Sequence, residues 1–460
     1  MKNLFLMLFC GIACTLTFTS CSDDDTGGGD PDPDNTVAGY IYTTTNGEST
    51  NQVIRFDRMD DGSLENETAY TTNSLGGANV SAGGDARGDF DSQGAIKIIG
   101  DYLLTVNAGG NDVSVFSLDR TNGELSLESN TGSGGTRPVS ITETPINGSP
   151  NQYWVVVGNQ WNNPNIQKDP PNIQRFPNDA FFMQDLTQPD ATDAERNIQL
   201  FRFNATDGSL NPVSQLDTYV RENGGPVCVT FSNDGTKLAV GTWGITHFMA
   251  EDPLLSEQHP SRVYIYDFNN GAVSNKRFFE EEGIAGTIGL DWNPNNSNTL
   301  YATNFNTTVA KTDNSLTVLQ DTGSDVTKIN NSTTGEEDDL DEACWTAVSP
   351  TGDRLYVASF TGNVITPFTL DGSGSVTGKL PFEAREDNAP PADSKDLYIT
   401  SDNKYLYNLG AFQSYSINIF DVTANGVDYD EQVVLETTQG SIGQPGAFNF
   451  LGLVGFDVEQ

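Results

Sequence analysis

The sequence has few basic residues, few cysteines and almost no histidine. Its 460 residues include 23 Lys and Arg against 63 Asp and Glu, so the formal net charge is −40 at pH 7. This charge opposes binding to nucleic-acid phosphates and to anionic lipid surfaces. Nothing in the chain has the spacing of a zinc site, and we expect no metal and no cofactor. We interpret the acidity as solubility outside the cell.

Long hydrophobic runs are missing, apart from one at the N-terminus. Lys2 precedes an apolar stretch over residues 4–18, and Phe18-Thr19-Ser20-Cys21 follows. This pattern resembles a bacterial lipoprotein signal over residues 1–20, with Cys21 as the lipidated residue. The alternative is an ordinary secretory signal with an incidental cysteine. Residues 21–38 are acidic and Gly-rich, which predicts a disordered tether. We therefore expect an outer-membrane lipoprotein, periplasmic or cell-surface facing, that contacts the membrane only through its lipid.

A strand–turn–strand phrase recurs along the rest of the chain. Its clearest copy is CWTAVSPTGDRLYVASFTGNVITPFTL, residues 344–370, and a second copy begins at Val227. In both copies the turn glycine stands three residues before a strand leucine. A third copy, after Lys395, has Asn403 where the others have glycine, and Asn is the next-best residue for a left-handed backbone position. Weaker copies open at Ala95, Pro138 and Ile288. Short β-rich runs between turn residues indicate antiparallel meanders.

The number of copies predicts a closed ring. Each of the six openings begins a unit of four strands, while the first unit, which contains YIYTTT, VIRFDR and ETAYTT, has only three. An unassigned apolar strand at residues 448–456 would complete that unit and leave no exposed edge. We therefore expect an all-β, monomeric, seven-bladed β-propeller over residues 39–460, with four-stranded antiparallel blades. The alternative is one or two β-sandwiches, which do not repeat one phrase so regularly.

Cysteine use agrees with this reading. Cys228 and Cys344 are the cysteines of the predicted propeller, and both lie on the opening strands of blades that are not neighbours. A disulfide between them would have to cross the central channel, so we expect two buried free thiols.

Two long insertions interrupt the repeat, at residues 159–197 in the third blade and 243–262 in the fourth. Long loops on a rigid scaffold are where recognition usually resides, so Trp161 and His247 are candidate ligand-binding residues. The alternative is that such side chains only pack their own loops. An acidic run at residues 336–342 could bind calcium, but it lacks the pattern of a known calcium loop, and a solvated loop is preferred.

The phrases DYLLTVNAGGNDVSVFSLD, GGTRPVSIT and EACWTAVSPTGDRLYVASFTGNVI resemble those of the lactonase-like seven-bladed propeller family, which includes 6-phosphogluconolactonase and carboxymuconate-cyclising enzymes. The resemblance covers residues 53–420. It implies His, Arg and Glu side chains at the channel mouth, where the inner strands begin. In this chain the matching phrases carry Arg137 and Glu342 and no histidine.

The resemblance makes Arg137 and Glu342 candidate catalytic residues. Arg137 could polarise a lactone carbonyl and Glu342 could activate water, or the two could form a structural ion pair. Gln93, Trp345 and Gln444 stand at other openings and are candidate ligand-binding residues.

Two functions remain open on the sequence alone. The preferred one is a cell-envelope module that binds a small polar ligand, a glycan or an envelope protein through the channel mouth and the long loops. The second is a lactonase-type hydrolase acting on a sugar-acid lactone. The sequence does not decide whether the protein is an enzyme.

Overall fold

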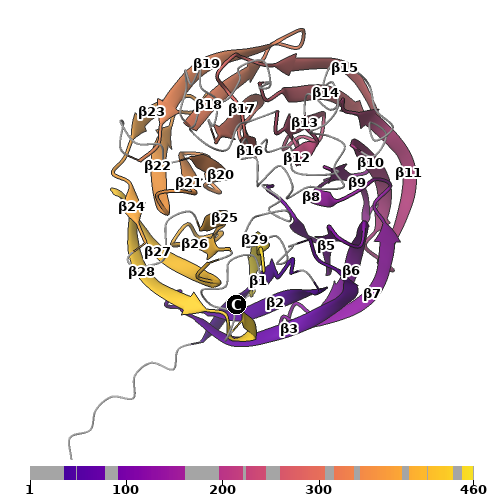
Figure 1. Ribbon diagram of the computed structural model, residues 1–460, viewed down its shortest axis with the longest axis vertical. Coiled ribbons are helices and arrows are strands. Elements are labelled where there is room, and N and C mark those ends of the chain that lie inside the picture. The colour runs from indigo at the N-terminus through magenta and orange to yellow at the C-terminus, as the bar shows by residue number, and fades with distance from the viewer. Residues whose placement is uncertain are drawn as a thin grey trace, which may run out of the picture. The chain divides into compact units, whose positions relative to one another are not determined.

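The computed structural model describes residues 36–458, except for 48, 78–91, 161–195, 221–223, 245–259, 306–314, 336–341, 386–392, 412 and 439–447. From Val37 onward the chain is one compact unit. Its strands form seven antiparallel sheets arranged in a ring (Figure 1). The predicted all-β seven-bladed propeller is confirmed.

Each of the first four blades has four strands, named below from the innermost outward. Blade 1 has β29 (Leu451–Asp457), β1 (Val37–Thr44), β2 (Thr50–Met59) and β3 (Leu64–Leu75). Blade 2 has β4 (Ile96–Ile99), β5 (Tyr102–Asn107), β6 (Asp112–Leu118) and β7 (Leu125–Gly132). Blade 3 has β8 (Pro138–Pro145), β9 (Gln152–Asn159), β10 (Asn197–Asn204) and β11 (Ser209–Thr218). Blade 4 has β12 (Pro226–Phe231), β13 (Lys237–Thr242), β14 (Val263–Asn269) and β15 (Ala272–Phe279).

The remaining blades follow the same order. Blade 5 has β16 (Thr287–Asn293), β17 (Asn296–Asn304), β18 (Ser315–Asp321) and β19 (Val326–Thr333). Blade 6 has β20 (Ala343–Val348), β21 (Arg354–Ser359), β22 (Val364–Leu370), β23 (Val376–Lys379) and β24 (Glu383–Ala384). Blade 7 has β25 (Ser394–Ile399), β26 (Tyr405–Gly410), β27 (Ser416–Thr423) and β28 (Gly426–Val434), and is followed by a 3-10 turn at Glu436–Thr438.

Blade 6 departs from the four-strand pattern because its outer edge is made of two pieces. β23 pairs with the end of β22, and β24 pairs with its start. Pro381 lies between the two pieces and has no N–H to donate to a ladder, so the pairing is interrupted there.

The last strand closes the ring as expected. β29 is antiparallel to β1, with Tyr40 opposite Phe456 and Thr44 opposite Leu451. In Figure 1 the yellow β29 lies beside the indigo β1. The guanidinium of Arg58 on β2 reaches across β1 and forms a 2.6 Å ion pair with Asp457. Closure covers the inner edge of β1, which would otherwise be unpaired.

The recurrent turn has the backbone that its residues demand. Gly235, Gly352 and Asn403 have φ values of 67°, 72° and 59°, in the left-handed region. Each donates its N–H to the carbonyl three residues earlier, at 2.8 to 2.9 Å. Asn403 therefore replaces glycine at an equivalent position, as the sequence comparison predicted.

Hydrophobic clusters join each blade to the next. One cluster combines Tyr42 of blade 1 with Leu103 and Phe116 of blade 2, and another combines Ile41 of blade 1 with Ile417 and Ile419 of blade 7. Cys228 and Cys344 are both buried thiols, and neither forms a disulfide within the described residues, as predicted. In the part of the chain that the structure describes, no helix has the length and hydrophobicity needed to cross a membrane.

Candidate functional site in the central channel

A short segment before blade 2 crosses the middle of the ring. Gln93 donates its backbone N–H to Val227 of blade 4 and accepts a 2.6 Å hydrogen bond from Ser140 of blade 3. The Trp345 indole of blade 6 donates to the carbonyl of Ser92 at 2.8 Å. The residues that hydrogen-bond to Ser92 and to the Gln93 backbone lie mainly in the first halves of the inner strands. Residues 92–94, which we call the crosspiece, therefore form a floor across the channel.

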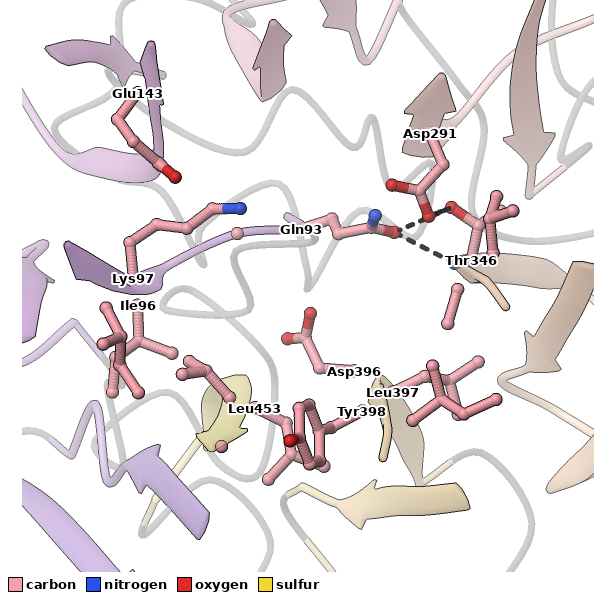
Figure 2. Close-up of a pocket in the computed structure, with 17 residues that line it drawn as sticks. Gln93, Ile96, Lys97, Glu143, Asp291, Thr346, Asp396, Leu397, Tyr398 and Leu453 are labelled. Carbon is pink, nitrogen blue, oxygen red and sulfur yellow. Dashed lines mark hydrogen bonds between the residues drawn. The ribbon is translucent and has the colours of Figure 1, made fainter. Parts of the chain in front are cut away.

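A cavity of about 380 Å³ lies against the crosspiece. Its walls come largely from the second halves of the inner strands β4, β8, β16, β20 and β25, together with β29. Its ionisable lining groups are Lys97, Glu143, Asp291, Asp396 and Tyr398. Figure 2 shows the first four of these side chains directed toward the open centre. The volume suits a small sugar-sized ligand.

Asp291 lies on β16 and is fixed by its neighbours. Its Oδ2 accepts a 2.8 Å hydrogen bond from Thr346 Oγ1, and the Gln93 side chain also hydrogen-bonds to this carboxyl. The Gln93 Oε1 in turn accepts from the Thr346 backbone N–H at 2.9 Å (Figure 2). Burial raises the pKa of Asp291 to about 6, although these hydrogen bonds and the Lys97 charge oppose the rise.

Asp396 lies on β25 and is almost fully buried, at 4% exposure. Its Oδ2 accepts a 2.7 Å hydrogen bond from the Gly452 N–H of the closing strand, and the Gly94 N–H of the crosspiece also bonds to this carboxyl. Burial raises the pKa of Asp396 to about 7, against these bonds and the charge of Lys395. The cavity thus contains two acids that titrate near neutrality.

Lys97 on β4 and Glu143 on β8 belong to neighbouring blades and point toward each other in Figure 2. No hydrogen bond or ion pair between described residues involves the Lys97 amine. The Glu143 Oε2 is buried and has no hydrogen-bond partner among the described residues. Burial raises the pKa of Glu143, and the Lys97 charge opposes the rise.

The described residues contain no group of three or more His, Cys, Asp or Glu side chains arranged to hold a metal ion. Carboxyl groups whose pKa values lie near neutrality, as those of Asp291 and Asp396 do, can accept hydrogen bonds and exchange protons.

Comparison with known proteins identifies the architecture. No protein-family model and no curated protein matches the chain. Among solved structures, a periplasmic gluconolactonase of Pseudomonas aeruginosa has a TM-score of 0.58 and 14% identity, over 90% of this chain and 99% of that one. The fold is that of the 6-phosphogluconolactonase-like propellers.

Two further lactonase-like propellers agree. A Bacteroides fragilis protein, whose assignment as a 6-phosphogluconolactonase is provisional, has a TM-score of 0.56 and 14% identity over 93% of this chain and 99% of that one. A Lactobacillus plantarum protein has a TM-score of 0.59 and 12% identity over 91% and 99%. At these identities the comparison establishes the lactonase-like fold alone.

The predicted catalytic pair lies elsewhere on this lactonase-like scaffold. Arg137 and Glu342 directly precede β8 and β20, and neither lines the cavity. They have φ values of 56° and 54°, while Gly286, directly before β16, has a φ of 65°. In blades 3, 5 and 6 the residue directly before the inner strand therefore has a left-handed backbone. The Glu342 carboxylate accepts a hydrogen bond from Thr361, and the catalytic roles of both residues stay predictions.

The predicted ligand-binding residues differ in where they lie relative to the cavity. Gln93 lines the cavity, where it joins the crosspiece to blades 5 and 6. Trp345 is fully buried beneath the crosspiece and is not part of the cavity wall. Trp161, His247, Gln444 and Cys21 lie outside the described residues, as does nearly all of the acidic run 336–342.

The sequence interpretation missed Lys97, Glu143, Asp291 and Asp396. Each is a charged residue on an opening strand that is otherwise mostly apolar or uncharged, as in AIKII, VSITET, IGLDW and KDLYI. Inner strands of a propeller face the channel, and a charge within such a run is rare unless a site requires it. This signal was present in the sequence, at strand centres rather than at strand starts.

Proposed function

We propose that the protein hydrolyses an uncharged sugar-acid lactone in the channel cavity. The observation that supports this is the pair of acids Asp291 and Asp396, which share one cavity and have pKa values of about 6 and about 7. Two carboxyl groups whose environments hold them at different pKa values are suited to act as base and acid. Of the two functions that the sequence left open, this is the second.

In the proposed reaction Asp291 is the general base, because its lower pKa leaves it mostly ionised at pH 7. It removes a proton from water as the water oxygen bonds to the lactone carbonyl carbon. Asp396 keeps a larger protonated fraction and donates its proton to the ring oxygen as the carbon–oxygen bond of the ring breaks. The product is the open hydroxy acid, which then ionises.

The charge of the cavity supports an uncharged substrate. Asp291, Asp396 and Glu143 face one lysine, Lys97, so a phosphorylated lactone would enter a field dominated by acids. Two of the proteins with this fold are described as lactonases, one for gluconolactone and one, provisionally, for its 6-phosphate. Hydrolysis of gluconolactone agrees with the proposal, because that lactone is uncharged. Hydrolysis of its 6-phosphate does not.

Base-titrated hydrolysis of D-glucono-1,5-lactone tests the proposal, after the uncatalysed rate is subtracted at each pH. The rate must rise as Asp291 ionises near pH 6 and fall as Asp396 loses its proton near pH 7, so kcat/KM passes through a maximum between these values. A rate no higher than that of buffer at every pH contradicts catalysis. Saturable binding of the lactone without turnover would instead support the binding module.

We also propose that the propeller works in the cell envelope, held by lipid on Cys21. The small residue before this cysteine and the acidic tether after it support this location. Labelling with a fatty-acid analogue in cells should mark the wild-type protein and leave Cys21→Ala unmarked. Equal labelling of both proteins would contradict lipidation at this residue.

A further inference from the structure

The inference concerns the opposite charges of Lys97 and Glu143, which belong to adjacent inner strands. Both residues line the cavity, and Figure 2 shows the amine and the carboxyl facing each other across a gap. No ion pair joins them in the part of the chain that the structure describes. They differ in this from Arg385 and Asp393, which are also of opposite charge and form a fully buried pair at 3.2 Å.

Keeping the Lys97 and Glu143 charges apart costs free energy unless another group contacts them. Within the described part of the chain, the Glu143 Oε2 is buried without a hydrogen-bond partner, and a polar atom in that state loses hydration without compensation. Buried polar atoms in folded proteins are normally satisfied, so an exception facing a cavity indicates a missing partner. That partner must offer a donor to Glu143 and an acceptor to Lys97.

A hydroxyl group meets both requirements with one atom. It donates its proton to the carboxylate and accepts a hydrogen bond from the ammonium. An anion would satisfy Lys97 but be repelled by Glu143, Asp291 and Asp396, and a cation would satisfy the acids but be repelled by Lys97.

We infer that Lys97 and Glu143 form a hydroxyl-binding subsite, which selects a polyhydroxylated ring over an unsubstituted one. The identification of the ring as a lactone depends on the proposed function, whereas the recognition of its hydroxyls does not. Hydrogen bonds to charged side chains discriminate strongly, because a ligand without the hydroxyl leaves both charges unsatisfied. Lys97 and Glu143 determine specificity, while Asp291 and Asp396 perform the chemistry.

Calorimetric titration with two lactams, which are not hydrolysed, tests the inference without turnover. The probes are D-glucono-1,5-lactam and δ-valerolactam, which has the same ring without hydroxyls. The wild type should bind the hydroxylated lactam at least about tenfold more tightly. Glu143→Gln and Lys97→Met should each reduce this ratio by about tenfold. The double variant should lose little more than either single variant, because one bridging hydroxyl couples the two side chains.

Glu128→Gln is the matched control, since Glu128 is exposed on the outer strand β7. It should keep the wild-type ratio. Equal binding of the two lactams by the wild type, or no binding of either, overturns the inference, and so does an unchanged ratio in Glu143→Gln. The wild-type comparison remains decisive if a variant does not fold.

The outcomes separate this inference from the proposed function. Selective lactam binding without lactone turnover leaves the subsite standing and removes the hydrolase. Turnover of D-glucono-1,5-lactone and δ-valerolactone with equal kcat/KM supports the hydrolase and removes the subsite.

Discussion

The starts of the inner strands and the positions further along them contrast in what determines their residues. At the starts, Arg137 and Glu342 occupy positions with left-handed backbone, where another blade has Gly286. Further along these strands, charged side chains face a cavity that a small ligand would fill. The comparison teaches that a motif at the edge of a repeat can reflect the geometry of the turn, while a charge that interrupts an apolar strand is the better candidate for a functional residue.

The largest expected effect separates these two regions by activity. Asp291→Asn should lower kcat/KM for D-glucono-1,5-lactone by about 10²–10⁴-fold, because a proposed general base is lost while the shape is kept. Arg137→Ala should stay within about twofold, because Arg137 does not line the cavity. Steady-state titration of both variants measures the contrast. A larger loss of kcat/KM in Arg137→Ala than in Asp291→Asn would indicate that the active site lies at the strand starts instead.

The second prediction concerns stability. The pKa of Asp396 is raised from 3.8 to about 7, so the stability supplied by its neutral form is complete below pH 3.8 and is lost as pH rises through about 7. Asp396→Asn stays neutral and avoids this loss, so the variant should gain up to about 4 kcal/mol relative to wild type at pH 8 compared with pH 3.5.

Urea unfolding at the two pH values measures this difference. Glu342→Gln serves as the control, since it removes a carboxyl at the strand starts, and it should not reproduce the change. A difference between wild type and Asp396→Asn that does not vary with pH would show that Asp396 is ionised without penalty.

The third prediction tests the crosspiece. Gln93→Met keeps the length of the side chain but removes its hydrogen bond to Asp291, so the pKa of Asp291 should rise by about one unit above about 6. Carbon-13 NMR titration of aspartate-labelled protein follows this carboxyl directly. Gln152→Met is the control, because the Gln152 Oε1 accepts only a surface hydrogen bond, from Arg202. An unchanged pKa of Asp291 in Gln93→Met would mean that the crosspiece does not influence this carboxyl.

The smallest effect is expected for the backbone at the strand starts. Glu342→Gly should change the free energy of unfolding by no more than about 1 kcal/mol, since glycine adopts the observed φ of 54° without strain. Glu342→Val should destabilise by about 1–2 kcal/mol, because a β-branched residue is disfavoured there. Thermal unfolding compares the two variants. Equal destabilisation would indicate that the Glu342 side chain matters more than its backbone.

Much of the fold could be predicted because each blade carries its own turn signal. Gly235, Gly352 and Asn403 marked equivalent hairpins, and the predicted blade openings agree with the observed inner strands to within one residue. The unassigned apolar strand at residues 448–456 required a partner, and blade 1 was the one unit that lacked an inner strand. Local turn chemistry and strand counting were therefore sufficient for the architecture.

The site was harder to predict because it depends on which residues meet across the ring. Asp291 and Asp396 lie more than a hundred positions apart and on blades that are not adjacent, and their pKa values follow from burial. Gln93 was identified as a channel residue, but its contacts with blades 5 and 6 required the path of the crosspiece. Such placements are set by three-dimensional packing rather than by any local pattern.

The antiparallel pairing of β29 with β1 makes the site depend on a strand that the ribosome delivers after all the other blades. Gly452, which holds Asp396, and Leu453, which lines the cavity, both belong to β29. A ribosome that stops before this strand would release a ring with one inner position empty and an acid without its amide partner. Premature termination would thus remove part of the cavity wall and ring closure together, so partial products would be open to proteolysis.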